Sequence, residues 1–208
     1  MDVWSAIDQE REALVEDLAH LDRSQWNTQS LCAEWTVRDV VGHLVFAANS
    51  GWKDYAIGVV KSKGNLDRFI SRAAKEIGAG SPSDLEQQFA DTIGSRNLPP
   101  FVKAECELAD IVCHGEDIRR PLGLQRHVPL DTLIAAAEFL KDDRITGTRK
   151  RIAGLEFKAT DADWSLGDGP SVEGPLKSLV LVMSGRTDPI DELSGEGLSE
   201  LRTRLAST

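Results

Sequence analysis

Three residues in two apolar, helical stretches could hold a metal ion. His43 and His114 both lie among apolar neighbours, and Asp110 precedes His114 by four positions. Side chains spaced i, i+4 share one face of a helix, so Asp110 and His114 can reach one ion at about 2.0–2.2 Å. If His43 faces them across a bundle, two imidazoles and one carboxylate leave positions open for water or substrate, which is typical of catalytic metal sites.

Simpler interpretations of the same residues stay open. An Asp-x-x-x-His pair on a helix occurs often by chance, and alone it is more often a hydrogen-bonded or capping pair than a metal site. Asp117, three residues beyond His114, could orient a metal ligand. Pairing of Asp117 with Arg119 or Arg120, or a capping role, is the favoured alternative.

The other histidines and cysteines are predicted to be structural or solvated. Cys32 precedes a capped helix and could be a nucleophile, but no histidine lies near it in the sequence. A buried, apolar role is therefore favoured for Cys32. Cys113 is expected to pack in the core, and His20 and His127 flank polar segments and are expected to be solvated.

Apolar residues at helical spacing predict a helical bundle that would position these side chains. Thr36 and Asp39 resemble a capping box with Asp in place of Glu, and Trp35 is expected to pack just before it. The expected helices cover residues 3–22, 36–62, 66–77, 82–93, 101–119 and 132–141.

The pattern changes after Asp142. Alternating residues at 155–159 and a short run at 164–166 predict strands, and residues 176–185 and 198–205 predict short helices. The sequence therefore predicts a mainly α protein, with a helical bundle over residues 1–142 and a small α/β C-terminal lobe over residues 143–208.

Composition excludes several classes of function. The 24 basic and 34 acidic side chains give a formal net charge of −10, which argues against nucleic acid or an anionic membrane surface as the partner. The sequence shows neither a signal peptide nor a membrane span. Three cysteines without a CxxC pair argue against a disulfide framework and favour a reducing cytoplasm.

Two segments resemble a known family. The stretch LCAEWTVRDVVGHL, which ends with His43-Leu44, and the stretch HGEDIRRPLG, which begins at His114, are similar to the hallmarks of the mycothiol-dependent maleylpyruvate isomerase family. That family belongs to the wider DinB-like metalloenzymes. The segment MSGR, which ends at Arg186, looks like part of the family's C-terminal region, so the resemblance covers nearly the whole chain.

The resemblance implies a DinB-like four-helix bundle, a metal site and a thiol cofactor. It places the metal, typically zinc, on His43, Asp110 and His114, although the family's isomerase has Glu where this chain has Asp110. The cofactor is mycothiol, the small thiol of actinobacteria, whose sulfur would bind the open metal position as a thiolate. Arg186 matches an arginine near the family's active site and could bind a substrate carboxylate; a surface arginine at a helix end is an equal alternative.

Two hypotheses of function follow. The leading one is a metal-dependent, mycothiol-using enzyme that transfers the thiol to a small electrophile or isomerises that electrophile with its help. The alternative is a non-catalytic bundle that binds a metal or ligand for regulation. Structural zinc sites prefer four ligands, often cysteines, whereas this sequence offers three and no CxxC pair, which favours an open metal site.

Overall fold

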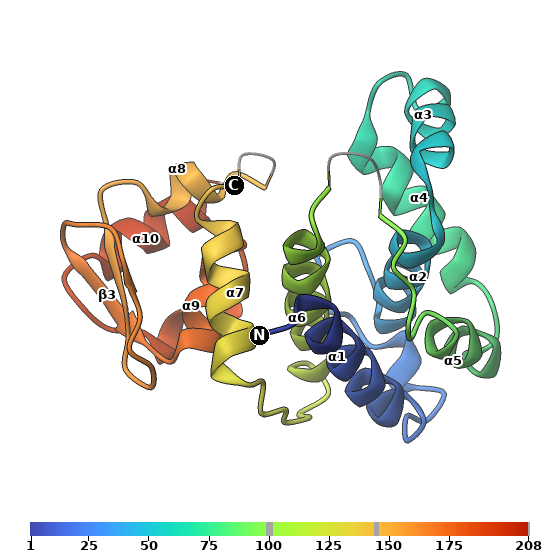
Figure 1. Ribbon diagram of the computed structural model, residues 1–208, viewed down its shortest axis with the longest axis horizontal. Helices are drawn as coiled ribbons and strands as arrows, with labels where there is room; N and C mark the ends of the chain where they lie inside the picture. The colour runs from blue at the N-terminus through green and yellow to red at the C-terminus, as the bar shows by residue number, and fades with distance from the viewer. Residues whose placement is uncertain (99–101, 144–145, 208) are drawn as a thin grey trace. The chain divides into compact units, whose positions relative to one another are not determined.

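The computed structural model describes residues 1–98, 102–143 and 146–207, and these residues form ten helices and one small sheet (Figure 1). The chain divides into two compact units. The first contains residues 2–107 and 114–126, and the second contains Met1, residues 108–113 and the chain from His127 onward. The helix α6 contributes residues to both units.

The first unit is helical and is organised around α2. Helix α2 packs against α4 and α5, and α1 packs against α5. At Gly42, next to His43, the two helices α2 and α4 touch through their backbones, because a Cβ atom there would collide with the Ala74 carbonyl oxygen and lie 2.8 Å from the Gly78 nitrogen. The bounds of its helices are α1 Val3–Leu18, α2 Val37–Asn49, α3 Trp52–Lys61, α4 Leu66–Gly78, α5 Pro82–Ala90 and α6 Ala104–Arg119, with a 3₁₀ turn at Gln25–Asn27.

The start of α2 is fixed by the predicted capping box, which is confirmed. The Asp39 carboxylate accepts hydrogen bonds from the Thr36 backbone N–H (2.9 Å) and the Thr36 hydroxyl (2.7 Å). Because this box satisfies groups that the first helical turn leaves unpaired, α2 begins at Val37 and carries His43 in its second turn.

The prediction of one helix over residues 36–62 is wrong, because the chain breaks between α2 and α3. Ser50 and Gly51 have extended backbone conformations, and the Asp54 carboxylate accepts the Gly51 N–H at 2.8 Å. Asn, Ser and Gly favour turns and helix caps over helix interiors, and this turn chemistry overrides the apolar periodicity. Likewise, α5 ends at Ala90 and not at Ile93.

Both ends of α6 are tied to α1 by buried ion pairs. Arg11 donates from Nη2 to Glu107 Oε1 at 2.7 Å, and Arg119 donates from Nε to Asp17 Oδ2 at 2.6 Å. The Arg11 and Arg119 side chains are almost completely buried. These two pairs prevent α6 from sliding along its axis relative to α1. They therefore fix the position of His114 relative to α1.

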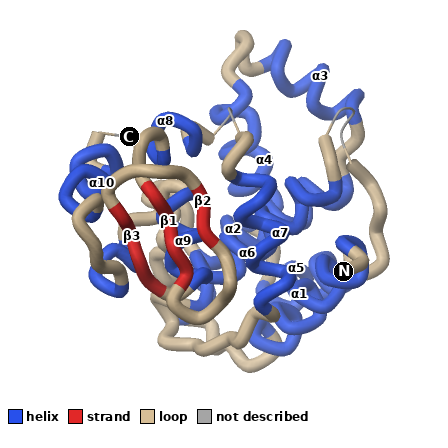
Figure 2. The backbone as a smooth tube through the Cα atoms, turned by 60° about the vertical axis from the view of Figure 1, so that its left-hand side comes forward, coloured by secondary structure: helices blue, strands red, loops and turns tan. Residues whose placement is uncertain are grey.

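The second unit is an α/β lobe with a mixed three-stranded sheet. The strand order is β2–β1–β3, with β1 antiparallel to β2 and parallel to β3, so that Phe157 pairs with both Leu166 and Val172 (Figure 2). Helix α9 packs on α7 and on the sheet. The bounds are α7 Leu130–Leu140, α8 Thr148–Ile152, β1 Glu156–Ala159, β2 Ser165–Leu166, β3 Ser171–Gly174, α9 Leu176–Met183 and α10 Leu198–Leu205, with a 3₁₀ turn at Asp188–Glu192.

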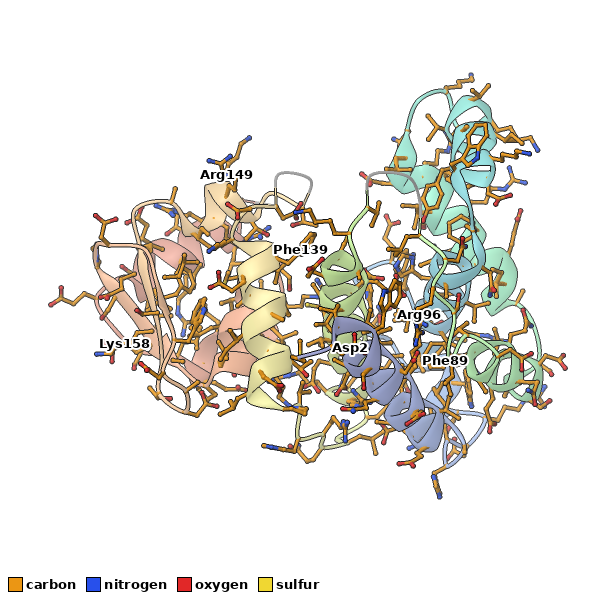
Figure 3. The ribbon with its side chains drawn as sticks, in the orientation of Figure 1. Asp2, Phe89, Arg96, Phe139, Arg149 and Lys158 are labelled. Carbon is orange, nitrogen blue, oxygen red and sulfur yellow. The ribbon has the colours of Figure 1, made fainter. Side chains whose placement is uncertain are left out.

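The core of this lobe lies between α9 and one face of the sheet. Phe157 and Ala159 on β1 are buried, whereas Lys158 between them is exposed and points away from the lobe (Figure 3). Alternation of this kind is the pattern of a strand with one covered face. It is the signal by which β1 was predicted.

The predicted fold class, mainly α with a small C-terminal α/β lobe, is confirmed. The sequence did not predict β3 or α8, and α7 begins at Leu130 after Pro129 rather than after Asp131. The boundary after residue 142 stays a prediction. Among the described residues, no helix is both long and apolar enough to cross a membrane.

Candidate metal centre

Helices α2 and α6 bring the two predicted histidines together. The rings of His43 and His114 have centroids 4.7 Å apart and meet edge to face, and the two residues are only 8% and 9% exposed. Asp110 stands one turn before His114 on α6. One ligand atom from each of His43, Asp110 and His114 lies within 4.8 Å of the other two, so the three predicted ligands do converge.

Asp117 lies behind His114 and sets the state of its ring. His114 Nδ1 is 2.8 Å from Asp117 Oδ2, and Asp117 is fully buried. Because an ionised carboxylate only accepts hydrogen bonds, Nδ1 carries the ring proton in this contact and Nε2 keeps a lone pair for a metal. The sequence favoured pairing of Asp117 with an arginine over a role in orienting a metal ligand. The contact with His114 is the second of these two arrangements.

The expectation that Cys32 is a buried apolar residue is wrong. Its half-buried thiol donates to Asp117 Oδ2 at 3.1 Å, and its sulfur lies 3.8 Å from His114 Nδ1. The prediction rested on the absence of a histidine close to Cys32 in the sequence. The histidine that contacts Cys32 in the fold is His114, which is 82 positions away. Tertiary contacts between segments that are distant in the sequence create this cluster.

The loop that carries Cys32 is held in place from both sides. The Leu31 N–H donates to the Asp117 carbonyl oxygen at 3.2 Å, which ties the loop to α6. The Cys32 N–H donates to Ser30 Oγ at 3.1 Å, and Gln29 Nε2 donates to the Cys32 carbonyl oxygen at 2.8 Å. These bonds fix the backbone from which the thiol projects.

Trp35 is a site residue that sequence reasoning missed. Its ring centroid lies 5.0 Å from that of His43 and 5.9 Å from that of His114. Its indole Nε1 donates to Ser71 Oγ on α4 at 3.1 Å, which fixes the ring. The signal was its position directly before the capping box, which starts the helix that carries His43.

Arg186, the predicted substrate contact, lies in the second unit just after α9. Its Nη1 donates to the Ser184 carbonyl oxygen at 3.4 Å. Burial, together with the positive charge of Arg186, lowers the pKa of neighbouring Arg151 from its usual value. Arg186 therefore stands beside a second cation, and its contact with a substrate stays a prediction.

The predictions for Cys113, His20 and His127 are confirmed. Cys113 is buried, and its thiol donates to Ser184 Oγ at 3.4 Å. His20 and His127 are exposed. The contrast leaves His43 and His114 as the two buried histidines of the protein.

Comparison with known proteins gives one family and two solved structures. Residues 7–98 match the family described as the mycothiol maleylpyruvate isomerase N-terminal domain. The match confirms the resemblance carried by the stretch that ends at His43-Leu44. A search of the curated proteins gives no significant match.

The two solved structures share the fold at low sequence identity. One is a histidine-to-alanine variant of the mycothiol-dependent maleylpyruvate isomerase, with a TM-score of 0.67, and the other is the same enzyme without that change, with a TM-score of 0.63. In both cases the identity is 12%, and the match covers 94% of this chain and 92% of the other. The likeness at this identity establishes the architecture of nearly the whole chain.

Proposed function

We propose that this protein is a metal-dependent enzyme that uses mycothiol on a small electrophile, either to transfer the thiol or to isomerise the electrophile. The fold shared with the mycothiol-dependent maleylpyruvate isomerase supports the proposal. So does the N-terminal family domain over residues 7–98. The sequence has three cysteines and no CxxC pair, which fits an enzyme of the reducing cytoplasm.

The observation that carries the proposal is the convergence of His43, Asp110 and His114. Two imidazoles and one carboxylate suit a borderline ion such as zinc. Three protein ligands leave a coordination position open, which is the mark of a catalytic centre. Their charge of −1 against a divalent ion leaves a net charge of +1, which favours an anionic fourth ligand such as a thiolate.

The residues around the three ligands have distinct tasks. Asp117 holds the Nδ1 proton of His114 and so would leave Nε2 available to an ion. The ring of Trp35, fixed by Ser71, covers both histidines and limits the access of water. Arg186 would bind a carboxylate of the substrate through its planar guanidinium.

His43, Asp110 and His114 would hold a divalent ion, and such an ion would lower the pKa of a coordinated thiol, so that mycothiol would be available as a thiolate at neutral pH. The protein has to orient the electrophile toward that sulfur and keep bulk water away. In a thiol transfer, the thiolate would form a bond to the electrophile, and a leaving group would depart with the electron pair of the bond that breaks. In an isomerisation, the thiolate would add to an activated double bond, and its loss after rotation about the resulting single bond would restore the double bond and the thiolate.

Calorimetric titration with mycothiol tests the proposal. We expect binding to the zinc-loaded protein, and we expect both the metal-free protein and the Asp110→Asn variant to lose most of it. His127→Ala, which removes an exposed histidine, is the matched control and should bind as the wild type does. Absence of mycothiol binding at every zinc loading, in protein shown to hold zinc, would contradict the proposed chemistry.

A further inference from the structure

We propose that Cys32, His114 and Asp117 form a second metal position, which takes a thiophilic divalent ion such as Cd²⁺ or Zn²⁺. It competes for His114 with the position formed by His43 and Asp110. The inference goes beyond the proposed function, because it requires neither mycothiol nor a substrate. It rests on a cluster that lies wholly within the first unit.

The three ligand atoms already have nearly the spacing that an ion would impose. Cys32 Sγ lies 3.1 Å from Asp117 Oδ2 and 3.8 Å from His114 Nδ1, and the two other atoms are 2.8 Å apart. Tetrahedral zinc with ordinary bond lengths places such atoms about 3.4–3.6 Å apart. The contacts of Asp117 with His114 and with Cys32 both have to open, each by about half an ångström, and the distance from Cys32 to His114 has to shorten slightly.

The cluster differs in chemistry from the first position. It contains a thiol, which selects softer ions than imidazole and carboxylate ligands do. Binding would release the Cys32 thiol proton to solvent and would shift the His114 ring proton from Nδ1 to Nε2, so that the imidazole stays neutral. The thiolate and the carboxylate then neutralise a divalent ion completely, whereas His43, Asp110 and His114 leave it with a net charge of +1. The second position therefore retains an ion without attracting an anionic fourth ligand.

The cluster combines rigid ligands with a route for the ion. Asp117 is fully buried and His114 is 9% exposed, whereas Cys32 is half-buried and lies toward the surface. The loop from Gln29 to Cys32 is fixed by its own hydrogen bonds and by the bond from Leu31 to α6. The ion can therefore arrive from the side of Cys32 and find ligands that need little rearrangement.

The shared histidine makes the two positions exclusive. The first position uses His114 Nε2, with Nδ1 protonated and bonded to Asp117, and the second uses Nδ1 itself. A neutral imidazole has one lone pair and one N–H, so it serves one ion at a time. A thiophilic ion at Cys32 thus removes both His114 and the support of Asp117 from the first position.

Titration with Cd²⁺, followed by the near-ultraviolet absorption of cadmium–thiolate bonds, tests the inference on the full-length protein. We expect the wild type to develop a thiolate band that saturates at one equivalent. The band should be lost in Cys32→Ser and kept in the matched control Cys106→Ser, which removes another partly buried thiol. Circular dichroism of each variant verifies that it is folded.

Asp110→Asn separates this inference from the proposed function. If the second position exists, this variant keeps the cadmium–thiolate band although it loses a ligand of the first position. A band that disappears in Asp110→Asn as well as in Cys32→Ser would mean that both residues hold one ion, and it would overturn the inference. So would a wild-type protein without a thiolate band, or a band that survives in Cys32→Ser.

Discussion

The helix α6 carries two kinds of buried polar cluster, and the difference between them separates structure from function. Toward its ends, carboxylates meet guanidinium groups: Arg11 pairs with Glu107, and Arg119 pairs with Asp17. In its middle and in its later half, the carboxylates of Asp110 and Asp117 meet His114 instead. The same helix therefore presents Glu107 and Arg119 to oppositely charged side chains of α1, and it brings the carboxylates of Asp110 and Asp117 to a histidine.

The two clusters show that a buried acid can have either of two roles, depending on its partners. A carboxylate whose charge is balanced by an arginine is complete within the protein, and it holds α1 and α6 in register. A carboxylate that converges with imidazoles and a thiol has partners that also donate electron pairs to metals. Breaking a pair of the first kind should lower the free energy of unfolding. Breaking a cluster of the second kind should lower the affinity for a metal ion.

The largest effect is expected from breaking the arginine cluster. Arg11→Met leaves Glu107 buried without its guanidinium partner and removes the hydrogen bond to the Thr92 carbonyl oxygen (2.8 Å). We expect a loss of about 3–5 kcal/mol in the free energy of unfolding, measured with urea. Arg72→Met, which breaks an exposed pair with Glu76, should have almost no effect. A loss in Arg11→Met as small as that in Arg72→Met would contradict the structural role.

A smaller effect on stability, joined to one on metal binding, is expected at the contact of α2 with α4. Gly42→Ala would push a methyl group into the Ala74 carbonyl oxygen, and real packing must shift to admit it. We expect a loss of about 1–3 kcal/mol in the free energy of unfolding and weaker zinc binding, because His43 moves with the backbone of α2. Unchanged stability would show that α2 and α4 separate easily at this point.

Substitution in the candidate metal cluster should lower the zinc affinity and should change the free energy of unfolding little. Asp117→Asn keeps the shape of the side chain but removes the carboxylate that holds the His114 Nδ1 proton. We expect zinc affinity to fall by about 10–100-fold, as measured by competition with a chromogenic chelator. Equal affinity in Asp117→Asn and the wild type would mean that Asp117 does not orient His114 for a metal.

The smallest effect is expected at a surface pair. Although partial burial raises the pKa of Asp8, its hydrogen bonds to Arg96 and the Gly94 N–H, together with the charges of Arg96 and Arg11, hold that pKa below its ordinary value of 3.8. A lowered pKa stabilises the folded protein above pH 3.8 and loses that contribution as the pH falls through the folded value.

Thermal melting of Asp8→Asn checks this expectation. The variant should melt slightly below the wild type at pH 7, and the difference should shrink steadily as the pH is lowered below 3.8. A difference that stays constant down to the acid limit would show that Asp8 acts through something other than its charge.

Local signals in the sequence account for much of the fold and for the three candidate metal ligands. The Asp110–His114 spacing needs only a helix to become a pair, and the capping box of Thr36 and Asp39 fixes where α2 begins. Hydrophobic periodicity does not reveal the break at Ser50-Gly51, because apolar residues continue on both sides of it at helical spacing. It is turn chemistry, and not periodicity, that ends α2 there.

The surroundings of the site could not be predicted in the same way. Cys32 and Asp117 are 85 positions apart, and only the packing of the 29–35 loop against α6 brings the thiol to the carboxylate. The position of Trp35 over both histidines likewise depends on Ser71 of α4. Such contacts join helices that are distant in the chain, and a single sequence carries no local trace of them.

The central claim is that His43, Asp110 and His114 hold a metal ion, and zinc content tests it most directly. The measurement uses protein with Cys32→Ser, which silences the second proposed position, and elemental mass spectrometry after dialysis against limiting zinc. We predict one equivalent of zinc in this protein and in its His127→Ala derivative, and almost none in its His43→Ala and Asp110→Asn derivatives. Equal zinc content in all four proteins would contradict the claim.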